Sequence, residues 1–429
     1  MKKIVALLLV MVLVVGMAAM FSGCKKEDEV GKVYYLNFKP EADAAWQALA
    51  KEYTEKTGVE VKVVTAASGQ YSTKLNAEMA KDDAPTLFQC GNAQGLKDWG
   101  DYCLDLRDTD VFKEMTTQDF NLKDEDGAVK AIGYCYEAFG IIVNKALLKQ
   151  AGYEITDIKD FASLKQIAES ITAKSAELGF SAFSSAGLDD SSSWRFSGHL
   201  ANMPLFYEFR DDKVTEQPAT IKGTYLDNYK MIWDLYINNS TCSGSDLPSK
   251  TGDNSKADFT EGKAVFYQNG TWEYDGLISA GMKAEDLQMI PIYCGVNGEA
   301  QAALCSGTEN CWAVNAKASK ADQKATLDFL KWVVTSESGT KMMAEQFGPI
   351  PFKQAKTPAN VFFADANKLI AEGKYTVTWA FNHTPNVDDW RAGVVSALKA
   401  YSAGSGKWED VKTAFVEGWA AQYKKQNAG

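Results

Sequence analysis

Residues 33–64 read VYYLNFKPEADAAWQALAKEYTEKTGVEVKVV and decide the fold class. The stretch begins with a mostly apolar run, places apolar side chains at helical spacing from Trp46 to Tyr53, and ends in alternating valines after Gly58. These patterns predict a buried strand, a helix that ends at a glycine, and a second strand. A further helix and a short strand at 86–88 continue the alternation, which is typical of an α/β fold with a mainly parallel sheet.

Polar side chains follow two of the predicted strands at the point where each strand ends. Asn37, Lys39 and Glu41 lie in the loop after the first strand, and Gln89 and Asn92 follow the third. Ligands of such sheets bind beyond the carboxyl ends of the strands. We therefore predict that these residues contribute to a ligand-binding site.

The same alternation continues through the rest of the chain. Strands are predicted at 140–144 and 264–267, and helical apolar stripes extend to the C-terminus at 387–401 and 411–419. About 405 residues follow position 24, more than a single hydrophobic core usually accommodates. The chain should therefore fold into two or more domains.

The first 24 residues predict export and a lipid anchor. They combine a cationic start (MKK), an uncharged apolar run at 4–21 and the small pair SG directly before Cys24. This pattern predicts a signal peptide at 1–23 and a lipidated linker at 24–31, with Cys24 as the acylated residue. An uncleaved membrane-spanning helix is the alternative, because about 18 apolar residues can just cross a bilayer.

The overall charge excludes some classes of partner. Cleavage before Cys24 would remove two lysines and change the net charge from −11 to −13. An acidic balance argues against nucleic acid or an anionic membrane surface as the partner.

The sequence contains no positive signal for catalysis, a metal or a cofactor. The chain has only two histidines and lacks a His-Glu-x-x-His motif and a Gly-x-Ser-x-Gly elbow. The segment GSGK at 404–407 resembles a phosphate loop, but Trp408 replaces the required Ser or Thr. Seven irregularly spaced cysteines follow Cys24 and predict free thiols. Carboxylates are plentiful, so counting leaves a glycosidase pair open.

Aromatic residues are the positive signal. Among eleven tryptophans, those on helical apolar stripes, such as Trp46, are expected in the core. Trp194, Trp272 and Trp390 differ, because each lies beside polar residues at the edge of a predicted element, and Trp194 is followed by Arg195. A tryptophan with such neighbours can stack on the face of a sugar. Interfacial packing is the alternative for each of them.

At this point the chain resembles the extracellular solute-binding proteins of ABC importers, of the maltose-binding-protein type. The resemblance covers nearly all of residues 32–429, although Thr86 departs from the family's usual Asp. Four stretches carry it: YTEKTGVEV (53–61), APTL (84–87), EAFGIIVNK (137–145), and FTEGKAVF (259–266) followed by NGTW (269–272).

The resemblance implies a hinged two-lobed periplasmic-binding-protein fold, in which each lobe is a mainly parallel sheet flanked by helices. The expected segments are 32–135 and 304–348 for the N-lobe, 140–301 and 352–429 for the C-lobe, and crossings near 136–139, 302–303 and 349–351.

The resemblance also implies ligand contacts at matching positions. Glu137 matches an acidic residue on the crossing strand, and Trp272 matches a stacking tryptophan. Trp194 and Trp390 lie where the family has further aromatics, and Arg195, next to Trp194, is predicted to contact the ligand as well.

The expected function is capture of a neutral oligosaccharide outside the cell and delivery to the permease subunits of an ABC transporter. Malto-oligosaccharide is the best single expectation, and no cofactor, metal or catalytic activity is implied. The protein should be a monomer held by lipid on the outer face of the membrane of a Gram-positive bacterium. The alternatives are a surface-anchored carbohydrate-active enzyme and a binding protein for a small non-sugar solute.

Overall fold

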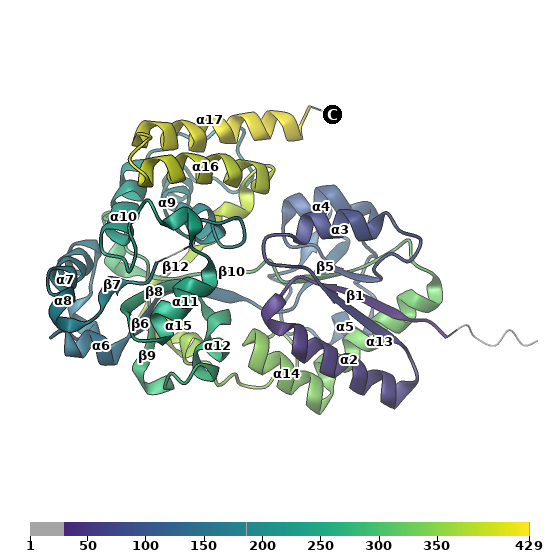
Figure 1. The fold of residues 1–429 in the computed structure, drawn as a ribbon. Coiled ribbons are helices and arrows are strands. Elements are labelled where there is room, and N and C mark those ends of the chain that lie inside the picture. The colour runs from purple at the N-terminus through teal and green to yellow at the C-terminus, as the bar shows by residue number, and fades with distance from the viewer. Residues whose placement is uncertain (1–29, 186, 429) are drawn as a thin grey trace, which may run out of the picture.

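The computed structural model describes residues 30–185 and 187–428, and it divides into two lobes that lie side by side (Figure 1). Each lobe has its own sheet with helices on both faces. Within the described residues, no helix is long and apolar enough to cross a membrane. The predicted signal peptide, Cys24 and most of the linker lie outside the described residues.

The N-lobe sheet has the strand order β2-β1-β3-β11-β5-β4. Its strands are β1 (Val33–Asn37), β2 (Val61–Thr65), β3 (Leu87–Gln89), β4 (Leu122–Lys123), β5 (Val129–Gly133) and β11 (Cys311–Val314).

Helices cover both faces of the N-lobe sheet. One face packs against α2 (Asp43–Thr57), α5 (Asp110–Lys113), α13 (Lys320–Thr335) and α14 (Glu337–Phe347). The other packs against α3 (Tyr71–Met79) and α4 (Ala93–Trp99). The predicted helix from Trp46 to Tyr53 is confirmed as part of α2. It ends where Gly58 takes a left-handed conformation with φ of 75°, which glycine adopts without steric cost.

The C-lobe sheet has the order β12-β10-β6-β8-β7, and β9 pairs with part of β6. Its strands are β6 (Glu137–Asn144), β7 (Ser181–Phe183), β8 (Ala264–Gly270), β9 (Leu287–Ile290), β10 (Ala302–Gly307) and β12 (Tyr375–Thr378).

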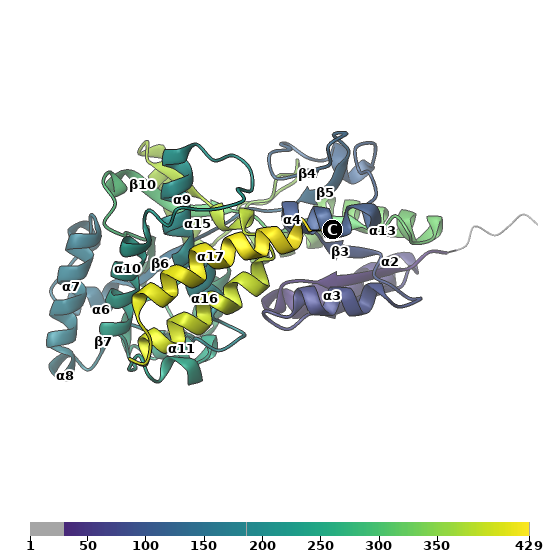
Figure 2. The same cartoon turned by 90° about the horizontal axis from the view of Figure 1, so that it is seen from above.

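The larger core of the C-lobe lies under α6 (Lys145–Gln150), α7 (Phe161–Ala173), α8 (Ser175–Leu178), the π-helix η4 (Arg195–Leu200), α9 (Ala201–Asp212), α10 (Leu226–Asn238), α16 (Val387–Ser402) and α17 (Trp408–Gln426). The opposite face packs against α11 (Gly252–Thr260), α12 (Tyr274–Ser279) and α15 (Val361–Ala371). Figure 1 shows α16 and α17 packed side by side at the top of the C-lobe, and Figure 2 looks down on this pair.

The chain crosses between the lobes at positions that differ from the expected ones. The first crossing lies between β5 and β6, at 134–136, so that most of the expected segment 136–139 already belongs to β6. The expected return at 302–303 is the start of β10, which pairs with β6 as far as Gly307, and the return lies at 308–310. Residues 349–351 still pack on the N-lobe, because Thr116 donates to the carbonyl of Pro351, and the last crossing lies at 354–360.

Both sheets are mixed rather than mainly parallel. Parallel pairs join β1 to β2 and β3, β10 to β12, and β7 to β8. The strands that enter a lobe from a crossing, β11 and β6, run the other way: β11 is antiparallel to β3 and β5, and β6 is antiparallel to β8 and β10. A strand that enters a lobe from the crossing runs away from the other lobe, opposite to the parallel strands beside it. The α/β fold class and the two lobes are as expected, and the predominance of parallel pairs is corrected.

Candidate functional site

The centre of the candidate site is a buried ion pair at the junction of the lobes. Lys39, from the loop after β1, donates to both carboxylate oxygens of Glu137, the first residue of β6, over 2.7 and 2.9 Å. The side-chain amide of Asn310, in the return crossing, donates to the same carboxylate over 2.7 Å. Lys39 is 7% exposed and Glu137 is 4% exposed. One residue of the N-lobe, one of the C-lobe and one of the return crossing therefore meet in a site shielded from water.

The charges of this pair are mutually stabilised. Burial alone would lower the pKa of Lys39, but the carboxylate of Glu137, with that of Glu41, outweighs burial and raises this pKa. The carboxylate of Glu41 lies 3.4 Å from the ammonium group and is partly exposed. Lys39 is therefore a cation that donates hydrogen bonds at all physiological pH values.

Asn37 positions Lys39 and has no exposed surface of its own. Its side-chain oxygen accepts from the backbone N–H of Lys39 over 3.0 Å, and its amide donates to the carbonyl of Lys39 and to Thr65. With 0% exposure, Asn37 shapes the loop that presents Lys39, and its contact with a ligand stays a prediction.

Trp272 lies directly beside the ion pair. The Lys39 ammonium is 5.0 Å from the centre of its ring, a cation–π distance. The Trp272 indole N–H donates to the side-chain oxygen of Asn269 over 3.0 Å. The ring centres of Trp194 and His199 lie 6.0 and 5.4 Å away. Trp194 and Trp272, which are 78 positions apart in the chain, thus belong to one aromatic cluster.

His199 is a member of this cluster that the sequence analysis did not single out. It stacks on Phe139 with ring centres 3.9 Å apart, and one ring nitrogen is 2.9 Å from the amide of Gln268. Burial lowers the pKa of His199 well below its usual value, and nearby Arg195 and Arg391 lower it further. The ring is therefore neutral and acts as an aromatic surface with hydrogen-bonding capacity.

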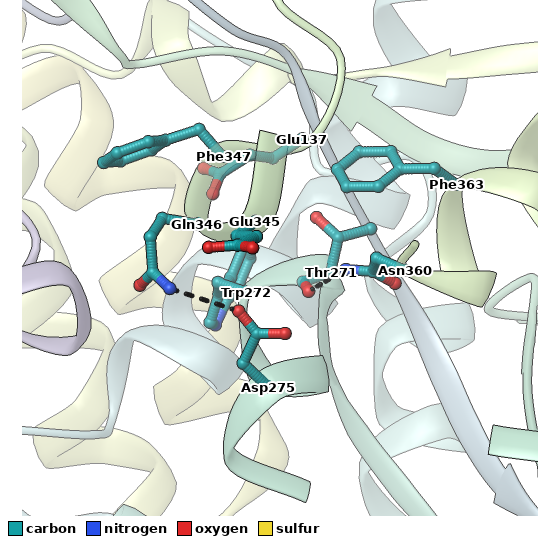
Figure 3. Close-up of a pocket in the computed structure, with 9 residues that line it drawn as sticks. All are labelled: Glu137, Thr271, Trp272, Asp275, Glu345, Gln346, Phe347, Asn360 and Phe363. Carbon is teal, nitrogen blue, oxygen red and sulfur yellow. Dashed lines mark hydrogen bonds between the residues drawn. The ribbon is translucent and has the colours of Figure 1, made fainter. Parts of the chain in front are cut away.

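A pocket opens beside Trp272 on the side of the last crossing (Figure 3). It is a small hollow with room for about one water molecule, and it opens to solvent. Gln346 of α14 donates to Asp275 of α12 over 3.4 Å, which joins the two lobes across the pocket. Burial raises the pKa of Asp275, and the charge of Glu345 raises it further. The lining residues are Glu137, Thr271, Trp272, Asp275, Glu345, Gln346, Phe347, Asn360 and Phe363.

The lobes also touch away from the crossings. The hydroxyl of Ser68 in the N-lobe donates to the carbonyl of Ser191 in the C-lobe over 3.0 Å. A Cβ on Gly69 would lie 3.1 Å from the carbonyl of Asp190. Helix α4 contacts the short helix η9 (Ala380–His383) of the C-lobe. The lobes are therefore closed on each other.

Gln89 and Asn92 lie near the return crossing, at Glu309. The amide of Gln89 donates to the carbonyl of Glu309. The Asn92 side chain caps α4, where its oxygen accepts from the backbone N–H of Gly95 over 2.9 Å. Burial raises the pKa of the Glu309 carboxyl, while the charges of Arg391 and Lys39 oppose the rise. Glu309 and Arg391 were missed because no spacing in the sequence relates them to the first lobe.

Two of the predicted site residues lie in the interior instead. Trp390 is 1% exposed, and its indole N–H donates to the carbonyl of Phe415 over 2.9 Å. Its ring packs edge-on against Phe415 and Trp419 of α17, so it belongs to the core between α16 and α17. Arg195 is also 1% exposed, and it contacts the hydroxyl of Tyr267 from inside the C-lobe. Trp390 therefore packs as a core residue, and the contact of Arg195 with a ligand stays a prediction.

No metal centre or disulfide accompanies this site in the part of the chain that the structure describes. No group of three or more His, Cys, Asp and Glu side chains there could hold a metal ion. The cysteines found there are free thiols, and all but Cys242 are buried.

Comparisons place the chain among known proteins. Residues 48–369 match the family described as bacterial extracellular solute-binding protein. No curated protein matches the chain.

Solved structures share the fold. RafE in complex with raffinose superimposes with a TM-score of 0.69 at 17% identity, covering 91% of this chain and 99% of RafE. A chitin oligosaccharide binding protein gives 0.71 at 16% identity, covering 93% and 98% of the two chains. A sugar transporter from Bacillus licheniformis, in complex with stachyose, gives 0.68 at 16% identity, covering 91% and 100%. The TM-scores show that these proteins share the fold of this chain, and at identities this low the similarity extends to the fold alone. The common fold agrees with the expected two-lobed architecture.

Proposed function

The chain belongs to the bacterial extracellular solute-binding proteins, and we propose that it binds an oligosaccharide between its lobes and delivers it to the permease of an ABC importer. The observation that carries the proposal is the position of Trp272, which lies between the aromatic pair Trp194 and His199 and the polar group of Lys39 and Glu137. An apolar ring can cover the C–H face of a sugar while charged and amide groups bind its hydroxyls.

The length and linkage of the oligosaccharide are left to experiment. Malto-oligosaccharide is the first probe, as the sequence resemblance implies. Proteins of the same fold are described with raffinose, stachyose and chitin oligosaccharide, so these sugars complete the panel.

A thermal-shift screen followed by calorimetry tests the proposal. With a glycan at 100 times its dissociation constant, the folded state should gain about 2.7 kcal/mol, which is seen as a rise in Tm. Trp272→Ala should weaken binding of the best glycan at least tenfold, because burying an aromatic side chain contributes about 1.5–3 kcal/mol and 1.4 kcal/mol is a factor of ten.

Trp332→Ala is the matched control. Trp332 is also partly buried, but it packs on Tyr53 and Phe329 at the outer face of the N-lobe. Its removal should lower Tm and leave affinity unchanged. Equal affinity of Trp272→Ala and the wild type would refute the proposed site.

The same panel distinguishes the other two functions. New reducing ends that form during incubation with the glycans, and that disappear on substitution of a carboxylate, would favour a carbohydrate-active enzyme. If amines or phosphorylated metabolites raise Tm and no glycan does, the ligand is a small non-sugar solute.

We propose that Cys24 anchors the protein outside the cell after removal of residues 1–23. Each buried CH₂ of an acyl chain contributes about 0.8 kcal/mol, so several chains give stable retention. Cys24→Ala should move the protein from the membrane fraction to the medium. Full membrane retention of that variant would contradict the anchor.

A further inference from the structure

Trp272 is held by the two residues at the end of β8. A Cβ on Gly270 would lie 2.2–2.4 Å from three carbons of the six-membered ring of Trp272. The indole therefore lies directly against the backbone of Gly270, at a distance that only glycine permits. This contact covers part of the ring, while Lys39 of the N-lobe approaches the ring to 5.0 Å.

Asn269 fixes the other end of the indole. Its side-chain oxygen accepts from the indole N–H of Trp272 and from the backbone N–H of Gly270, both over 3.0 Å. Its amide donates to the hydroxyl of Tyr267 over 2.6 Å, and Arg195 donates to the same hydroxyl over 3.4 Å. Asn269 is 2% exposed, so water cannot replace these bonds easily.

We propose that Gly270 and Asn269 are positioning residues that hold the Trp272 indole in its binding orientation before any ligand arrives. The inference rests on the proposed function for the identity of the ligand, but the orientation itself is a property of the free protein. A side chain that is fixed in advance loses no rotamer freedom on binding, a loss that otherwise weakens affinity roughly two- to tenfold.

Gly270→Ala is a selective probe of this arrangement. Gly270 has φ of −118° and ψ of −179°, an extended conformation that alanine adopts without strain. The three nearest obstacles to the new methyl group all belong to the Trp272 ring. The substitution should therefore displace that ring and leave the strand in place. Asn269→Ala tests the other contact should Gly270→Ala fail to fold.

The first readout needs no ligand. Protein labelled with 5-fluorotryptophan gives a ¹⁹F resonance for each tryptophan, and Trp272→Phe assigns the one of interest. Gly270→Ala should shift the Trp272 resonance, together with that of neighbouring Trp194. Asn269→Ala should shift or broaden the Trp272 resonance. An unmoved Trp272 resonance in both variants would overturn the proposal, and shifts of all resonances would indicate a general structural role, which also overturns it.

The second readout is a double-mutant cycle with the best glycan of the panel. Gly270→Ala should weaken binding about tenfold or more, and Asn269→Ala roughly two- to tenfold, the range that corresponds to the ordering cost above. In a Trp272→Ala background both substitutions should have no further effect, because the ring through which they act is absent.

The two proposals fail in different ways. If Trp272→Ala binds as tightly as the wild type, the proposed site is wrong, and the ¹⁹F spectra still decide the orientation. If Trp272→Ala weakens binding but Gly270→Ala and Asn269→Ala do not, the site stands and the positioning role is refuted. Equal losses in the wild-type and Trp272→Ala backgrounds would refute it as well.

Discussion

Glu137→Gln should destabilise the protein strongly, because it removes the charge that compensates buried Lys39. The two side chains are 8% and 5% exposed and meet at 2.7 Å. Removing one partner of a buried ion pair costs about 3–5 kcal/mol, since it leaves an uncompensated charge in the interior. Glu41 stays 3.4 Å from the ammonium group at 39% exposure and offsets part of this cost. We expect a loss of about 2–3 kcal/mol in the free energy of unfolding.

Differential scanning calorimetry at pH 7 measures this loss. At about 2–4 °C per kcal/mol, Tm should fall by roughly 5–10 °C. Glu55→Gln is the control, because Glu55 pairs with Lys51 over 3.9 Å on the surface and should contribute less than about 1 kcal/mol. Adding Lys39→Met to Glu137→Gln removes the unpaired cation and should restore part of Tm. An unchanged Tm for Glu137→Gln, or a double variant less stable than the single one, would refute this reasoning.

Three further predictions follow from other parts of the structure. Hydrogen bonds from Lys81 and Lys74 lower the pKa of Glu78 to about 2, so the charged carboxylate stabilises the fold above pH 4.5 and this contribution is lost as pH falls toward 2. Glu78→Gln should therefore lower the free energy of unfolding by about 1–2 kcal/mol at pH 7, and urea melts in which the variant is still less stable than the wild type at pH 2 would contradict this. Burial raises the pKa of Asp365 to about 6, so ionisation of this carboxyl costs stability as pH rises from 3.8 through 6. Asp365→Asn should raise Tm at pH 7.5 but not at pH 4, and an equal change in Tm at the two pH values would show that titration of Asp365 is not the cause. Ser68→Trp places a large side chain in the contact between the lobes, so it should increase the radius of gyration in small-angle scattering with little change in Tm. An unchanged radius of gyration would mean that this contact does not hold the lobes closed.

The local patterns of the sequence determined the fold class and part of the site. The alternation of strands and helices in residues 33–64 gave β1, α2 and β2, because periodic burial is a property of neighbouring residues. The polar loop after the first strand led to Lys39, the polar neighbours of Trp272 and the family resemblance both led to Trp272, and the resemblance alone led to Glu137. These three side chains do meet, and their role toward a ligand stays a proposal.

Contacts between distant segments decided what the sequence could not. Trp390 opens a helix beside polar residues, as a binding tryptophan would, yet its burial depends on α17, which packs over it. Asn310 donates to Glu137 across 173 positions, and His199 joins Trp272 only because η4 folds over the end of β8. The crossings likewise depend on strand pairing, which holds β10 in the C-lobe to Gly307. Periodicity reports whether a side chain faces an interior, but which segment forms that interior is fixed by the packing of the whole chain.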